Sequence, residues 1–168
     1  MALSTFAPNE LSIVLLGNGW QHVLSGFAED SIVSIERQSD TFNMYVGADD
    51  TPTRIYQANT AMMVTASLAQ TSESNDVLSA VYNKDRETRD GLFSILVVDN
   101  SGRSRYFAEE AYVGNVPNTS YGNSMQVFEW VIHAPKSDIN IGGNSKLSAS
   151  VQATLTALGV VVAPQWTA

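Results

Sequence analysis

The sequence predicts a mainly β domain with one short α-helix packed on it. Apolar and polar residues alternate in most segments, as at Met62, Val64, Ala66 and Leu68, and such alternation is typical of half-buried strands. Clusters of Gly, Asn, Asp and Pro separate the alternating segments, as turns do. Helical spacing interrupts the pattern at residues 75–83. A chain of 168 residues is long enough to bury one hydrophobic core.

The chain opens with a predicted β-hairpin. Residues 11–16 (LSIVLL) and 20–24 are rich in β-forming side chains, and they flank Gly17-Asn18-Gly19. This tripeptide tolerates the positive φ angles of a tight turn. A third strand is expected at residues 32–37.

A long hairpin with an acidic tip is expected next. The segment FNMYV (residues 42–46) alternates apolar and polar side chains, which predicts that one of its faces is buried. The following GADDTPT (residues 47–53) has the composition of a loop, with Asp49 and Asp50 near its centre. Residues 54–58 return as the second strand of the hairpin.

The predicted helix follows a strand at residues 60–70. Ser72 or Ser74 is positioned to cap the helix, which we expect to span residues 75–83. Its apolar side chains form a single stripe, as in a helix packed on a sheet. Residues 84–90 (KDRETRD) carry charges without an apolar anchor, so they predict a solvated helix end or loop.

The second half of the domain is predicted to be all strand and turn. The segment LFSILVV is apolar on both faces and therefore indicates a central strand. The segment FEWVIHA directs Phe128 and Trp130 to the core and Glu129 to the opposite face. Further strands are expected around the turn at residues 99–102 and at residues 139–141.

The composition changes after Asn144. Residues 146–158 are rich in Ser, Ala and Thr, with apolar residues at helical spacing. We therefore divide the chain into a β domain at residues 1–144 and a C-terminal extension at residues 145–168, which is either part of the same domain or packed on its exterior.

The charge of the chain argues against nucleic-acid binding. It has 17 acidic and 9 basic residues and a formal net charge of −8, whereas affinity for phosphate backbones comes mainly from Lys and Arg. There are no cysteines, so no disulfide or thiolate metal site can form. The N-terminal residues lack the pattern of a signal peptide, and the apolar runs are too short to span a membrane, so we expect synthesis in the cytoplasm.

No group of residues predicts catalysis. The two histidines, His22 and His133, are each isolated on a strand pattern, and no acid, base or nucleophile is placed to work with them. Asp49 and Asp50 lack the further oxygen ligands that a calcium site needs. We expect no enzyme activity, no cofactor and no metal.

Several segments together resemble the tail tube proteins of contractile-tailed bacteriophages, over about residues 11–144. The segments that carry the resemblance are FNMYVGADDTPTR, SLAQTSESNDVLSA, VVDNSGR, FEWVIHAP and DINIGGN. The resemblance implies a β-sandwich or half-barrel carrying one helix. It also implies that copies of the chain close into six-fold rings, which stack into a hollow tube for genome ejection.

The resemblance also implies candidate assembly residues. Glu36 and Glu129 would line an acidic channel, past which DNA slides without being held. The inter-ring loop would consist of Gly47, Ala48, Asp49, Asp50, Thr51, Pro52 and Thr53. Its carboxylates would meet a partner surface near Lys84, Arg86 and Arg89, and Trp166 would anchor the C-terminal extension or face the sheath.

The partners implied by the resemblance are other copies of the chain, the tail sheath, baseplate and tail terminator proteins, and the tape measure protein in the lumen. The expected location is the tail of the virion, after assembly in the host cytoplasm. Two alternatives stay open from the sequence. One is a tube subunit of a type VI secretion system or a tailocin, and the other is a monomeric β-rich ligand-binding module.

Overall fold

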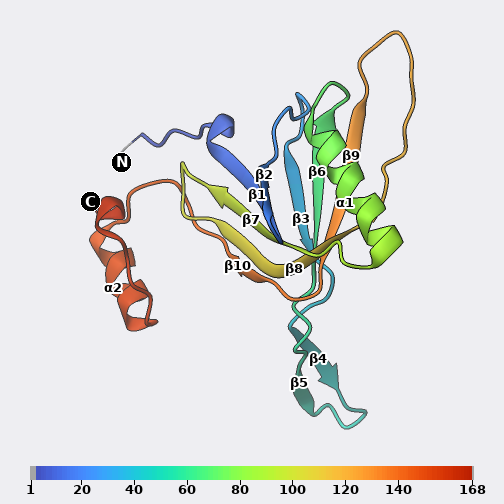
Figure 1. The fold of residues 1–168 in the computed structure, drawn as a ribbon. Coiled ribbons are helices and arrows are strands. Elements are labelled where there is room, and N and C mark those ends of the chain that lie inside the picture. The colour runs from blue at the N-terminus through green and yellow to red at the C-terminus, as the bar shows by residue number, and fades with distance from the viewer. Residues whose placement is uncertain (1–2, 168) are drawn as a thin grey trace.

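The computed structural model describes residues 3–167 and contains ten strands and two α-helices (Figure 1). The strands are β1 (Leu11–Gly17), β2 (Trp20–Val23), β3 (Val33–Arg37), β4 (Phe42–Val46), β5 (Pro52–Tyr56), β6 (Met62–Ala69), β7 (Phe93–Asp99), β8 (Arg105–Asn115), β9 (Val127–Ala134) and β10 (Asp138–Asn140). The helices are α1 (Ser74–Thr88) and α2 (Ala149–Ala157), with short 3-10 turns at Pro8–Glu10 and Pro164–Trp166.

Seven strands form one antiparallel sheet in the order β2-β1-β7-β8-β9-β6-β3, and β10 pairs with β8 outside this path. Core residues come from both halves of the path, including Ile13 and Ile95 on one side and Val64 and Ile132 on the other. A flat sheet cannot bring these side chains into one cluster, so the sheet curves around the core. The mainly β fold predicted from the sequence is confirmed, and of the β-sandwich or half-barrel that the resemblance implies, one curved sheet fits the half-barrel.

The predicted first hairpin and the predicted strand FEWVIHA match the structure closely. In the first hairpin, Gly17 pairs with Trp20 across the Asn18-Gly19 turn, and Gly19 has a φ of 80°. In β9, Phe128 and Trp130 point into the core as expected. The sequence pattern underestimated the length of β8, because only the residues just after the turn at 99–102 were expected to form a strand. β8 continues to Asn115 through an irregularity in its pairing with β7.

Helix α1 is longer than the predicted residues 75–83. It begins at Ser74 and ends at Thr88, before Arg89 in the left-handed conformation. The added turn at its end contains Lys, Arg and Glu, which favour helix even when solvated. The buried Leu78 packs α1 onto the core.

The start of α1 is held by serine hydroxyls. Neither predicted serine is the N-cap residue: that position is Glu73, which makes no side-chain capping bond. Ser72, one residue earlier, accepts a hydrogen bond from the backbone N–H of Ser74 at 3.2 Å and so satisfies one N–H of the first turn. Ser74 is fully buried, and its hydroxyl bonds the Nε2 of His22 at 2.8 Å and the backbone N–H of Ser25 at 3.0 Å. These bonds fix α1 against the end of β2.

Strands β4 and β5 form a separate two-stranded hairpin, which we call the arm. The arm pairs with no other strand of the described chain, and it projects from one end of the domain (Figure 1). The expectation that one face of residues 42–46 is buried was wrong, because Phe42, Met44 and Val46 are all exposed. Their alternation reflects an apolar face that the chain's own core does not cover.

The C-terminal extension folds back on itself beside the domain (Figure 1). Its two ends meet where Leu147 bridges Thr167 and donates a backbone hydrogen bond to Trp166 at 2.8 Å. Helix α2 lies between these ends and has no buried residue. The final residue, Ala168, lies outside the described residues.

Candidate assembly surfaces

The arm carries large apolar side chains on one of its faces. Pairing of β4 with β5 places Phe42 opposite Tyr56 and Met44 opposite Arg54. The two aromatic rings lie 5.6 Å apart, and the guanidinium of Arg54 lies 4.5 Å from the centre of the Phe42 ring. These contacts stiffen the arm but leave Met44 79% and Tyr56 66% exposed. An exposed apolar face of this kind is a mark of a protein interface.

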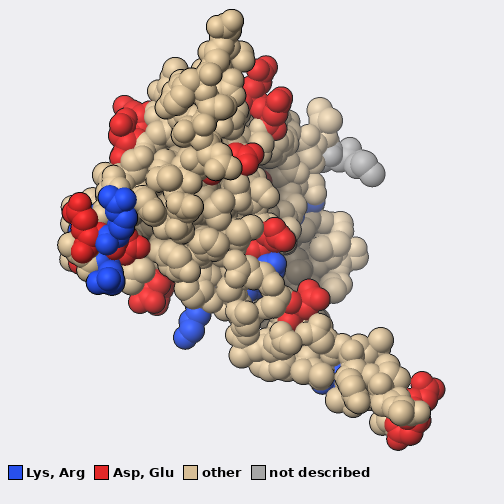
Figure 2. Space-filling model, turned by 90° about the vertical axis from the view of Figure 1, so that its right-hand side faces the viewer, with Lys and Arg blue, Asp and Glu red and all other residues tan. Residues whose placement is uncertain are grey.

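The tip of the arm is a tight acidic turn. Asp50 adopts a φ of 66°, and its backbone N–H donates to the carbonyl of Gly47 at 2.9 Å. The hydroxyl and then the backbone N–H of Thr51 lower the pKa of Asp49. The tip therefore keeps its negative charge at neutral pH, and Figure 2 shows acidic side chains at its far end.

The outer face of the sheet, opposite the core, bears both predicted channel carboxylates. Glu36 lies opposite Met63 of β6, which in turn lies opposite His133 of β9, so these residues share one face. Glu129 alternates with the buried Phe128 and Trp130 and therefore lies on the same face. Both carboxylates are exposed.

Sequence reasoning missed a third carboxylate in this region. Glu110 precedes the buried Ala111 in β8, and by strand alternation it shares the outer face with Tyr112. Tyr112 marks that face because its ring stacks on His133 at 5.5 Å. The signal was present in the alternation of Ala111 and Val113, but this part of β8 had not been recognised as strand.

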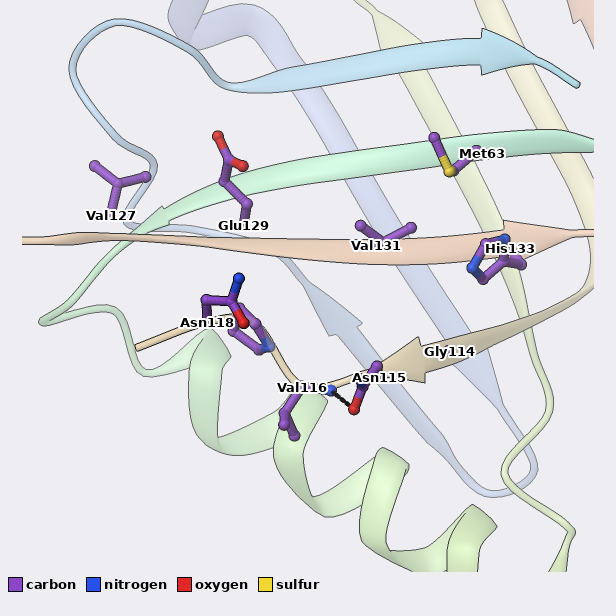
Figure 3. Close-up of a pocket in the computed structure, with 10 residues that line it drawn as sticks. Met63, Gly114, Asn115, Val116, Asn118, Val127, Glu129, Val131 and His133 are labelled. Atoms are coloured by element: carbon purple, nitrogen blue, oxygen red, sulfur yellow. Dashed lines mark hydrogen bonds between the residues drawn. The ribbon is translucent and has the colours of Figure 1, made fainter. Parts of the chain in front are cut away.

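A hollow of about 620 Å³ lies on the outer face, where the end of β8 separates from β9. Figure 3 shows Glu129, Val131 and His133 along β9 on one side of it, and Asn115 and Val116 on the other. Glu129 is the only Asp, Glu, Lys or Arg among the described residues that line it. This hollow is therefore open and weakly acidic.

The proposed basic partner surface lies at the end of α1. Lys84, Arg86 and Arg89 are all exposed there. Acidic side chains alternate with them, so the stretch from Lys84 to Asp90 carries as many negative as positive charges. Figure 2 accordingly shows acidic and basic side chains intermixed. The end of α1 therefore has no net positive charge.

Trp166 lies against its own domain. The guanidinium of Arg103 lies 4.7 Å from the centre of the Trp166 ring and also donates to the carbonyl of Ser145 at 2.7 Å. Arg103 thus joins the β7–β8 turn to both ends of the C-terminal extension.

The described residues contain no cluster of three or more metal-ligating side chains. None of the helices in residues 3–167 is both long and apolar enough to cross a membrane. The Nε2 of His22 is hydrogen-bonded to the hydroxyl of the fully buried Ser74, and the ring of His133 is stacked on Tyr112.

A family model of the bacteriophage PhiTE tail tube protein matches residues 1–142, which is most of the chain. The chain belongs to this tail tube family. The matched region ends within two residues of the predicted domain boundary at Asn144, and the predicted resemblance is confirmed. The C-terminal extension lies outside the matched region.

A relative in Pseudomonas phage KPP10, described as structural protein ORF10, is 50% identical over 167 residues, covering 97% of this chain and 96% of that protein. The fold is similar to that of the tube-terminating cap of the anti-feeding prophage, with a TM-score of 0.55 and 11% identity over 83% of this chain and 93% of the cap. A sheath/tube terminator of an extracellular contractile injection system has a TM-score of 0.48 and 10% identity, covering 84% of this chain and all of the terminator.

Proposed function

We propose that this tail tube protein assembles into six-fold rings that stack into the inner tube of a contractile phage tail, the channel for genome ejection. The observation that carries the proposal is the arm, whose apolar face is not covered by any of residues 3–167. In a solitary subunit this face costs free energy, because apolar area in water is unfavourable. Contact with another subunit removes that cost.

The edges of the sheet support the same proposal. Strands β2 and β3 end the sheet path, so each has one edge without a neighbouring strand in the described chain. Unpaired edges invite pairing with other chains, and closed rings remove them. The direct test is electron microscopy of the purified protein over a range of concentrations. Rings or tubes support the proposal, whereas dispersed monomers support the ligand-binding module instead.

In this proposal, the outer face carrying Glu36 and Glu129 lines the channel. The outward side chains of β3, β6 and β9 include these two carboxylates and no Lys or Arg. An acidic wall repels DNA phosphates, so the genome passes without being held.

We expect tubes of the Glu36→Lys/Glu129→Lys variant to retain DNA that tubes of the unaltered protein release, because Lys displaces phosphate counterions. Retention should weaken steeply with added salt. Gel retardation of preformed tubes with linear DNA provides the measurement.

The matched control is Glu73→Lys/Glu87→Lys, at the N-cap and in the last turn of α1, which makes the same charge change at two exposed positions away from this face. Equal retention by both variants would contradict the channel assignment. So would an imaged tube in which Glu36 and Glu129 point away from its axis.

Residues 47–53 at the tip of the arm are proposed to contact the neighbouring ring, with Asp49 and Asp50 facing the end of α1. The arm and the β8–β9 loop extend from opposite ends of the domain (Figure 1). Stacking subunits along this direction therefore brings the arm of one ring to the next ring.

The C-terminal extension is proposed to pack on the outside of its own or an adjacent ring. No charged side chain follows Lys146, and Val161 of this segment is 94% exposed. Depletion of charge is typical of the centre of protein interfaces. Arg103 and Trp166 would hold the extension in place while its apolar surface contacts an adjacent subunit or the sheath.

We expect truncation after Asn144 to leave a folded subunit that still forms tubes, because the buried core of the described residues ends at Ala134 and Ile139, which packs against it, is kept. These tubes should disassemble at a temperature several degrees below that of full-length tubes. Light scattering during heating measures this, and Trp166→Ala is expected to cause a smaller shift in the same direction. Unchanged disassembly of the truncated tubes would refute an assembly role for the extension.

The proposed partners are further copies of the chain, the sheath, baseplate and terminator proteins, and the tape measure protein in the lumen. DNA passes through without specific binding, and assembly takes place in the host cytoplasm before the tube becomes part of the virion. A tube subunit of a type VI secretion system or a tailocin is the second candidate. The 50% identity to a phage structural protein favours the virion, and capsid and terminase genes beside the coding sequence would support it further.

A further inference from the structure

An apolar groove of about 350 Å³ lies between the edge strand β2 and helix α1. Trp20 lines it from the strand, and Val77, Ala80 and Val81 line it from the helix. Lys84 is the only Asp, Glu, Lys or Arg among the described residues that line the groove. The groove therefore combines an apolar surface with a single positive charge.

The sequence builds this groove on rigid elements. Ala80 and Val81 follow Val77 by three and four residues, and Lys84 follows them by four and three, so the four residues form one stripe of α1. On the strand side, Trp20 packs on the ring of Phe93 with 6.0 Å between centroids. The bond between His22 and Ser74 described above joins the two sides, so the groove exists before any partner binds.

The indole of Trp20 also depends on Gly17. A side chain at position 17 would collide with the Trp20 ring, because an added Cβ would lie closer to it than any real contact allows. Gly17 therefore leaves room for the Trp20 ring that lines the groove, in addition to its place in the first hairpin.

The arm has the properties that this groove requires. Its apolar face is exposed, and its five-residue strand is about 17 Å long. Its tip carries Asp49 and Asp50, whose charge is opposite to that of Lys84. The larger hollow beside β9 fits less well, because its charged lining residue is Glu129, which would repel the tip.

We infer that the groove between β2 and α1 receives the arm of a second copy of this chain. The apolar face of the arm lies against Trp20 and Val81, and the tip carboxylates lie beside Lys84. This inference rests on the proposed function, because it names the surface that receives the assembly arm. Donor and receptor surfaces differ, so the contact repeats from copy to copy and produces an open assembly.

The first test fills the groove. Ala80 is an exposed helix position that lines it, so Ala80→Trp blocks the groove without altering the core. Asn83→Trp is the matched control, since it adds the same bulk to an exposed position of α1 outside the groove lining. Sedimentation of the two variants should show loss of tubes, or an increase of about tenfold or more in the concentration needed to form them, for Ala80→Trp alone.

The second test locates the arm by cross-linking. The chain has no cysteine, so two can be introduced without background reaction. Ala48→Cys at the tip with Ala80→Cys in the groove lining keeps all the charges and should give a ladder of linked subunits with a bismaleimide reagent. Ala48→Cys with Val127→Cys, in the hollow beside β9, should give no ladder.

The outcomes separate the two proposals. If the unaltered protein forms no rings or tubes, the proposed function fails and this inference fails with it. If tubes form but the Ala80 cysteine yields no ladder, or the Val127 cysteine yields one instead, the docking site is wrong and the tube function stands. Where the sedimentation and cross-linking results disagree, cross-linking decides, because it reports position directly.

Discussion

Replacing Trp130 by alanine is expected to reduce the free energy of unfolding by about 3–5 kcal/mol. The side chain is only 2% exposed and packs in the core between the sheet and α1. Its Nε1 also donates a hydrogen bond to the Oδ1 of Asn75 at 2.9 Å, so one residue joins β9 to the first turn of the helix. Alanine would create a large cavity and leave the Asn75 oxygen without its donor.

Urea denaturation measures this effect, carried out in a variant that does not polymerise so that assembly does not add to stability. Trp130→Phe is the control, because it keeps most of the apolar volume and removes the indole N–H. We expect Trp130→Phe to cost about 1–3 kcal/mol, the usual cost of an unpaired buried polar group. If Trp130→Ala reduced the free energy of unfolding by less than Trp130→Phe does, the assigned core position of this tryptophan would be wrong.

Local sequence patterns were sufficient to predict the first hairpin and β9. In the hairpin, the Asn18-Gly19 turn determines which residues pair, and only short-range geometry is involved. In β9, large side chains at Phe128, Trp130 and Ile132 contrast with a carboxylate at Glu129, so the buried face was evident.

The second half of β8 was not predictable in the same way. The pairing of β8 with β7 is irregular there, and both Ala108 and Ala111 are buried although they are three residues apart. An odd spacing between two inward residues breaks the period of two on which strand prediction depends. Glu110 was therefore missed as a member of the outer face.

The arm shows a different limit of sequence reasoning. Alternation at Phe42, Met44 and Val46 correctly indicated a strand with an apolar face, but it could not indicate which molecule covers that face. A strand face that packs on the chain's own core and a strand face that packs on a partner show the same alternation of apolar and polar residues. The distinction depends on where the hairpin leaves the sheet, which is a property of the whole fold.

Reversing the charge of the arm tip, in the variant Asp49→Lys/Asp50→Lys, is expected to block tube formation while leaving the subunit folded. Both residues are exposed at the far end of a hairpin that contributes no residue to the described core. The substitutions should therefore not destabilise the folded domain. In the assembly, the new lysines would face Lys84, and juxtaposed like charges oppose binding. We expect the concentration needed for tubes to rise about a hundredfold or more.

Sedimentation and electron microscopy measure assembly, and circular dichroism checks the fold. Asp49→Asn/Asp50→Asn separates charge from shape, since it removes the attraction without adding repulsion and should have a weaker effect. Adding Lys84→Glu to the lysine variant restores opposite charges at the contact and should recover part of the assembly. Normal tubes from Asp49→Lys/Asp50→Lys would show that the tip does not meet a basic surface. A block that Lys84→Glu fails to relieve would place the tip against a different part of the neighbouring subunit.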